Sequence, residues 1–91
     1  MSDTAPASAH SATILVVDDE ESIRFTFDTF LSKAGYTVLS AGRLETAEGL
    51  LARNAIDLIF CDIALPDGSG IALLDRVEGD VYDCPVVMIT G

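Results

Sequence analysis

Basic residues, histidine and tryptophan are scarce in this sequence. Five Lys and Arg residues stand against 15 Asp and Glu residues, so the 91-residue chain carries a formal net charge of −10 at pH 7. A surface this acidic repels phosphate backbones, which disfavours direct nucleic-acid binding. The chain has one histidine, His10, and a lone histidine in a small, polar segment is more often solvated than bound to a metal.

Long apolar runs are also absent. No run approaches the roughly 18–20 residues of a membrane-spanning helix, so no membrane segment is expected. Residues 1–12 are small and polar and include no Lys or Arg, which makes them a poor signal peptide. We therefore expect a cytoplasmic protein with a flexible N-terminal tail over residues 1–12 and one domain over residues 13–91.

The two cysteines, Cys61 and Cys84, do not form a CxxC pair and have no histidines around them. A zinc site or a thioredoxin-type redox site is therefore not indicated. Each cysteine falls in an apolar segment, so the sequence predicts reduced cysteines packed in the core.

Apolar residues, in contrast, are plentiful: they make up 49% of the chain, and the mean hydropathy is +0.41. The chain is long enough for one core and too short for two. Apolar runs and helix-spaced segments alternate along it. The predicted strands are 13–17, 36–40, 57–62 and 85–90, and the predicted helices are 20–34, 44–54 and 71–77.

This β-α-β-α-β-α-β order favours an α/β fold with right-handed crossovers and a doubly wound parallel sheet. In the first helix, apolar residues recur at helical spacing and predict the face that packs on the sheet. They are Ile23, Phe27, Phe30, Leu31 and Ala34. Phe25 lies off this stripe, and Gly35 is a stop signal for the helix.

Polar side chains end the predicted strands. Asp18 and Asp19 follow the first strand, Asp62 closes the third and Thr90 closes the fourth. Ligand sites of open parallel sheets lie at the carboxyl ends of the strands, where converging carboxylates favour a hard cation such as Mg²⁺. The alternative is that Asp19 or Glu20 only caps the following helix.

Three segments, taken in order, resemble the receiver domain of bacterial two-component response regulators. They are ILVVDDE over 14–20, DLIFCDIALPDGSG over 57–70 and PVVMITG over 85–91. The sequence is most similar to receivers that precede an activator domain for alternative-sigma-factor transcription. The resemblance implies a flavodoxin-like fold and a signalling module, not a turnover enzyme, whose partner is a sensor histidine kinase.

The resemblance also implies a role for each matching residue. Asp62 is the phosphoryl acceptor, Thr90 is the switch hydroxyl, and Pro66 and Gly70 shape the loop beside the site. The implied Mg²⁺ ligands are Asp18, Asp19, Asp62 and the backbone carbonyl of Ala64.

The sequence departs from the family pattern after Thr90, where receivers continue with a helix, a lysine-ended strand and a last helix. The single lysine, Lys33, matches no position of that strand. We therefore expect an incomplete receiver whose open sheet edge favours a homodimer or a domain-swapped oligomer.

Two other functions stay open at this point. The chain could be a self-associating receiver fragment without signalling activity, as the missing lysine suggests. It could also be a Mg²⁺-dependent phosphohydrolase or nucleotide-binding enzyme, although it lacks both the GxxxxGK[ST] and the GxGxxG phosphate-binding motifs.

Overall fold

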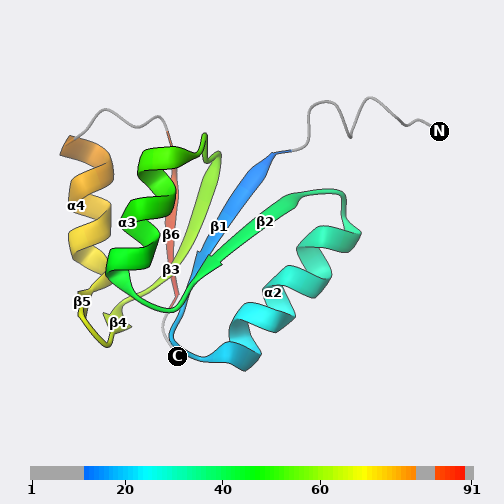
Figure 1. Cartoon of the computed structure of the whole chain (residues 1–91), viewed down its shortest axis with the longest axis horizontal. Helices are drawn as coiled ribbons and strands as arrows, with labels where there is room; N and C mark the ends of the chain where they lie inside the picture. Colours follow the sequence, from blue (N-terminus) through cyan, green and yellow to red (C-terminus); the bar gives the residue numbers. More distant parts are fainter. Residues whose placement is uncertain (1–11, 80–83, 90–91) are drawn as a thin grey trace.

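The structure, a computed structural model, describes residues 12–79 and 84–89 and forms a parallel sheet flanked by helices (Figure 1). The sheet has the order β2-β1-β3-β6, and a two-stranded hairpin, β4-β5, stands beside it. The strands are β1 (Thr13–Val17), β2 (Thr37–Ala41), β3 (Leu58–Asp62), β4 (Ala64–Leu65), β5 (Gly68–Ser69) and β6 (Val86–Ile89). The helices are α2 (Glu21–Lys33), α3 (Leu44–Arg53) and α4 (Gly70–Gly79).

All pairings in the four-stranded sheet are parallel, as the alternation of strands and helices predicts. At the carboxyl end of β1, Val17 lies opposite Ala41 of β2 and Cys61 of β3. Asp62 in turn lies opposite Ile89 of β6. The carboxyl ends of the strands therefore meet at one edge of the sheet.

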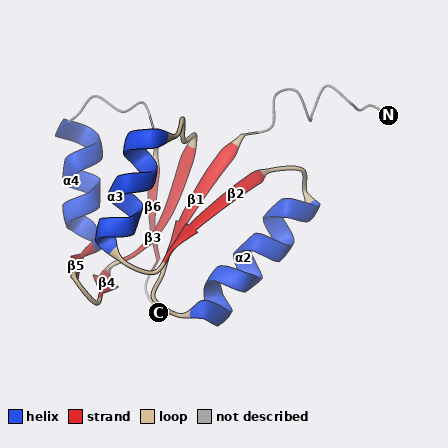
Figure 2. Cartoon of the chain, viewed as in Figure 1, coloured by secondary structure: helices blue, strands red, loops and turns tan. Residues whose placement is uncertain are grey.

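The helices cover opposite faces of the sheet (Figure 2). On one face, Leu15 and Ile59 are fully buried in a core with Ala47 and Leu51 of α3 and Leu73 of α4. Burying such a side chain stabilises the fold by about 1.5–3 kcal/mol. On the other face lies α2, whose Phe27 ring is centred 5.1 Å from that of Phe60 in β3. Side chains of the strands alternate between these two environments.

The predicted apolar stripe of the first helix is wrong at Phe30, which is 70% exposed, and Ala34 is exposed as well. The half-buried line runs instead through Ile23, Phe27 and Leu31, which are spaced by four residues. A helix that lies on one part of an open sheet buries a narrow stripe, and a residue three positions after Phe27 turns to the other side of it. Phe25, the residue off the predicted stripe, is 69% exposed.

The segment predicted to be a loop after the third strand contains the β4-β5 hairpin. Ala64 pairs with Ser69 and Leu65 pairs with Gly68, so Pro66 and Asp67 form the turn. The helix that follows begins at Gly70 and ends at Gly79, so it is longer than the predicted 71–77. The hairpin was missed because two-residue strands show no hydrophobic alternation.

An apolar groove remains on the α2 face of the sheet. It measures about 460 Å³ and is lined by Ala12, Ile14, Leu31, Tyr36, Asp57, Leu58, Phe60 and Pro85. Among the described strands, β6 is the edge next to β3, and its Val87, which lies opposite Phe60, is 42% exposed. Apolar surface therefore extends from the groove to the edge strand.

Gly70 joins the hairpin to α4 at a very close approach to β3. Its N–H donates to the carbonyl of Ile63 at 2.7 Å. A Cβ at this position would collide with the carbonyl oxygen of Asp62 and would lie 2.9 Å from the Cys61 sulfur. Only glycine therefore lets α4 start directly beside the end of β3.

We predict that Gly70→Ala lowers the free energy of unfolding by about 1–3 kcal/mol, because the new methyl group overpacks this contact. For a domain of this size, the Tm falls by about 4–8 °C per kcal/mol. Gly49→Ala is the matched control, since the nearest atoms to its Cβ are those of Arg53 at 3.7–4.0 Å. In the middle of α3, Gly49→Ala raises the free energy of unfolding by about 0.5–1 kcal/mol. Equal Tm values for Gly70→Ala and the wild type would contradict the close approach.

Candidate functional site

Three carboxylates meet at the carboxyl edge of the sheet, as the strand ends predict. Asp18 and Asp19 follow β1, and Asp62 ends the neighbouring strand β3. One carboxylate oxygen from each lies within 4.8 Å of the other two. Asp18 is buried, Asp62 is half-buried and Asp19 is exposed, so the cluster opens toward solvent on the side of Asp19.

Asp18 is held through its backbone and its side chain. Its N–H donates to the carbonyl of Ala41 at 3.0 Å, which ties the end of β1 to the end of β2. Its Oδ1 accepts from the N–H of Glu20 at 2.9 Å, and its carbonyl accepts from Nη1 of Arg24 at 2.7 Å. The buried carboxylate is therefore fixed in direction before any ligand binds.

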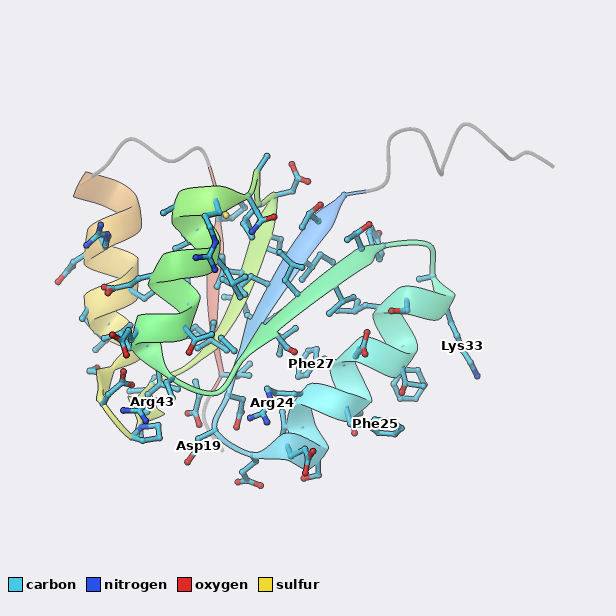
Figure 3. All side chains as sticks on the ribbon, in the orientation of Figure 1. Asp19, Arg24, Phe25, Phe27, Lys33 and Arg43 are labelled. Atoms are coloured by element: carbon cyan, nitrogen blue, oxygen red, sulfur yellow. The ribbon has the colours of Figure 1, made fainter. Side chains whose placement is uncertain are left out.

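The alternative that these acids only cap the helix does not fit the geometry. The N-cap of α2 is Glu20, and its side chain makes no capping hydrogen bond. Asp19 points away from the sheet at the lower edge of the molecule in Figure 3. Its carboxylate belongs to the acidic cluster.

Asp62 lies between the sheet and the hairpin. Its Oδ1 accepts from the N–H of Ala64 at 3.3 Å, and its own carbonyl accepts from the thiol of Cys61 at 3.3 Å. Ala64, the first residue of the hairpin, thus orients the Asp62 carboxylate. The assignment of the Ala64 carbonyl as a metal ligand stays a prediction.

Cys61 is the buried residue directly before Asp62. It is fully buried between β1 and β6, and burial raises the pKa of its thiol to about 11, helped by the negative charges of Asp62 and then Asp18. The thiol is therefore protonated at neutral pH, and the prediction of a reduced core cysteine is confirmed for Cys61. Cys84 is half-buried and packs against the core.

The donor set fits a small divalent cation. All three side chains offer hard carboxylate oxygens, which suit Mg²⁺ and not a thiolate-seeking metal. Ligands on opposite sides of one Mg²⁺ are about 4.2 Å apart, twice its usual bond length to oxygen. The three carboxylate oxygens lie within 4.8 Å of one another, which is close to this ligand–ligand distance. A cation also offsets the mutual repulsion of three adjacent negative charges.

Asp67 has a structural role that the sequence analysis missed. Its Oδ1 accepts from the N–H of Leu44 at 2.7 Å and its Oδ2 from the N–H of Glu45 at 3.0 Å. Arg43 lies next to it, with Nε 3.8 Å from Oδ2. Asp67 therefore caps the start of α3 from the distant hairpin, because the residue at the N-cap itself, Arg43, makes no side-chain cap. Its place in a Pro-Asp-Gly sequence is typical of a turn and does not indicate this contact.

These contacts hold the pKa of Asp67 below its usual 3.8, chiefly through the backbone hydrogen bonds from Glu45 and Leu44. A carboxyl whose pKa is lower in the folded state stabilises the fold above its unfolded pKa. That stabilisation is lost as the pH falls through the folded pKa.

We predict that Asp67→Asn lowers the urea midpoint at neutral pH and that the difference from wild type shrinks in acid, where Asp67 is itself protonated. Asp75→Asn removes the same charge from the exposed side of α4 and is the control. We expect Asp75→Asn to leave the urea midpoint near that of the wild type across the same pH range. A pH-independent difference for Asp67→Asn would argue against the carboxylate cap.

One residue of the predicted site, the switch hydroxyl of Thr90, lies outside the described residues. Lys33, the single lysine, is in the last turn of α2, at the opposite end of that helix from Asp19 (Figure 3). Lys33 is thus remote from the acidic cluster. Pro66 lies in the turn of the β4-β5 hairpin.

The family model of the response regulator receiver domain matches residues 14–91. The chain belongs to this receiver family. The resemblance carried by the three segments is thereby confirmed, and so is the flavodoxin-like parallel α/β fold. Receiver domains are signalling modules of two-component systems, they bind Mg²⁺ at an acidic pocket, and they interact with histidine kinases.

Two regulators of Pseudomonas aeruginosa are similar to this receiver domain in sequence. The phosphate regulon transcriptional regulatory protein PhoB is 40% identical over 81 residues, which are 87% of this chain and 35% of PhoB. The response regulator protein PilR is 40% identical over 77 residues, which are 85% of this chain and 17% of PilR. The receiver domain thus spans about a third or less of these relatives.

Solved receivers are similar in structure as well. The beryllofluoride-activated NtrC4 receiver dimer aligns with a TM-score of 0.81 at 35% identity, over 87% of this chain and 65% of that one. The non-phosphorylated HemR receiver of Leptospira biflexa aligns with a TM-score of 0.82 at 34% identity, over 88% of this chain and 64% of that one. Among the residues that the structure describes, no helix is long and apolar enough to span a membrane.

Proposed function

We propose that this receiver domain accepts a phosphoryl group on Asp62 and passes the signal to an output that regulates transcription. The observation that carries the proposal is the convergence of Asp18, Asp19 and Asp62 at the carboxyl edge of the sheet. The donor is the phosphohistidine of a sensor kinase or a small phosphodonor. The proposal places the domain in the cytoplasm, where such a kinase presents its phosphohistidine, and the protonated thiol of the buried Cys61 suits that reducing compartment.

Asp62 is the nucleophile in the proposed transfer. The hydrogen bond from Ala64 orients its carboxylate through Oδ1, so the proposal assigns the attack on phosphorus to Oδ2. The new O–P bond forms as the P–N bond to the donor imidazole breaks, and the imidazole nitrogen keeps the electron pair and takes up a proton. The product carries roughly one more negative charge than the free carboxylate. That charge is the signal which the switch hydroxyl of Thr90 is proposed to bind.

Asp18, Asp19, Asp62 and the Ala64 carbonyl are proposed to hold Mg²⁺, which offsets the charge of the phosphoryl oxygens during transfer. Asp18 serves this role because its hydrogen bonds to Ala41 and Glu20 fix it in place. Asp19, which is exposed, reaches the same ion from the solvent side.

We predict that the wild-type chain forms a Mg²⁺-dependent adduct with acetyl phosphate or beryllofluoride and that Asp62→Asn abolishes it, since the amide has no nucleophilic oxygen anion. Intact-protein mass and ¹⁹F NMR measure the two adducts. Asp75→Asn, which removes an exposed carboxylate from α4, keeps both. The absence of any adduct in the wild type would favour a receiver fragment that does not signal. Turnover of a small phosphoester with release of phosphate would instead indicate a phosphohydrolase.

A second proposal concerns partners: this 91-residue chain forms a homodimer through the edge of β6. In the described sheet β6 pairs with β3 alone, and its Val87 is 42% exposed beside the apolar groove. Antiparallel pairing of two β6 strands is self-complementary and closes after two copies. The NtrC4 receiver, one of the structural neighbours, is itself a dimer.

We predict a dimer mass in light scattering at micromolar concentration, with an affinity that rises with salt, because each chain carries a net charge of −10. Val87→Lys shifts the mass to the monomer, since a charged side chain at an edge strand blocks pairing. Phe25→Lys, on the exposed side of α2, is the matched control and leaves the dimer intact. A monomer mass for the wild type would refute the proposal, and loss of the dimer in Phe25→Lys alone would move the interface to α2.

A further inference from the structure

Arg24 makes a contact with the acidic cluster that the family resemblance did not assign. It lies in the first turn and a half of α2, and its Nη1 donates to the backbone carbonyl of Asp18 at 2.7 Å. Side chains of a helix tilt toward its N-terminus, so an arginine at this position reaches back to the strand that precedes the helix. Figure 3 shows Arg24 at the same end of the molecule as Asp19.

The contact controls the peptide that joins the two adjacent acids. The carbonyl of Asp18 and the N–H of Asp19 belong to one planar unit, so fixing the carbonyl also fixes the direction in which Asp19 leaves the strand. The N–H of Asp18 and its carboxylate are held elsewhere, by Ala41 and by Glu20. Arg24 therefore supplies the restraint on the link between the buried ligand Asp18 and the exposed ligand Asp19.

The loop after β2 is shaped to admit this guanidinium. A Cβ at Gly42 would lie 3.0 Å from Nη1 of Arg24, 3.5 Å from its Cζ and 3.8 Å from the carbonyl oxygen of Asp18. A side chain at Gly42 would therefore push the guanidinium away from its acceptor. The space at Gly42 therefore fits the placement of Arg24 that the hydrogen bond requires.

We propose that Arg24 is a positioning residue of the metal site: it orients the Asp18–Asp19 peptide so that both carboxylates face one Mg²⁺. The inference rests on the proposed function. Arg24 acts through the backbone and does not touch the ion. Because it is a cation near a cation site, its charge alone opposes Mg²⁺ binding. Positioning and simple electrostatics therefore predict opposite signs when Arg24 is removed.

The experiment is calorimetric titration of Mg²⁺ well below the Tm of each variant, where every protein is folded. Arg24→Met keeps the length of the side chain but loses its donors, and we expect binding about tenfold weaker, the loss of one charge-assisted hydrogen bond. Arg24→Lys restores part of the affinity. Gly42→Val weakens binding although Arg24 and its charge are intact. Arg53→Met, which removes the same charge from the far end of α3, is the control and does not weaken binding.

The outcomes separate the inference from the proposed function. If the wild type binds Mg²⁺ and Arg24→Met binds it as tightly as Arg53→Met or more tightly, Arg24 is only a nearby charge and the inference is overturned. The proposed function would stand in that case. If the wild type itself binds no Mg²⁺, both the positioning role of Arg24 and the proposed function are overturned. Weaker binding in both Arg24→Met and Gly42→Val, with Arg53→Met unaffected, supports the positioning role.

Discussion

The parallel pairing of β1 with β3 is the constraint on which the site depends. Val17 lies opposite Cys61, so the residue after each of them, Asp18 and Asp62, reaches the same edge of the sheet. A parallel sheet brings strand ends together without any contact between their side chains. Buried residues before the acids, such as Leu15 and Ile59, set this register, because a slip of one residue would turn them to the other face of the sheet.

The cost of that convergence is electrostatic repulsion, and the surrounding backbone holds the acids in place. Ala41 and Glu20 fix Asp18, and the N–H of Ala64 contacts Asp62. Burial raises the pKa of the Cys61 thiol, and the negative charges of Asp62 and Asp18 raise it further. The cluster is therefore an acidic site, and a divalent cation is the kind of ligand that offsets such repulsion.

Much of the fold and the position of the acidic cluster could be predicted from the sequence. The continuous apolar run before Asp18 indicated a buried parallel strand, and the acids that end two such runs indicated their meeting point. Phe30 was assigned wrongly, because helical spacing does not reveal how wide a stripe the sheet covers; Phe30 is 70% exposed. The capping by Asp67 was missed for another reason: its partners, Leu44 and Glu45, lie 23 and 22 residues away in the sequence.

The sequence by itself determined the order along the chain of the helices and of the four strands in the parallel sheet, the family, and the three acids of the cluster, since these depend on local patterns and on short motifs. The tertiary structure alone decided how the acids are held. The contact of Arg24 with the Asp18 carbonyl, the room left by Gly42 and the collision that reserves position 70 for glycine all depend on atoms from different elements. No local pattern encodes such distances, because they are set by the packing of helices and loops against the finished sheet.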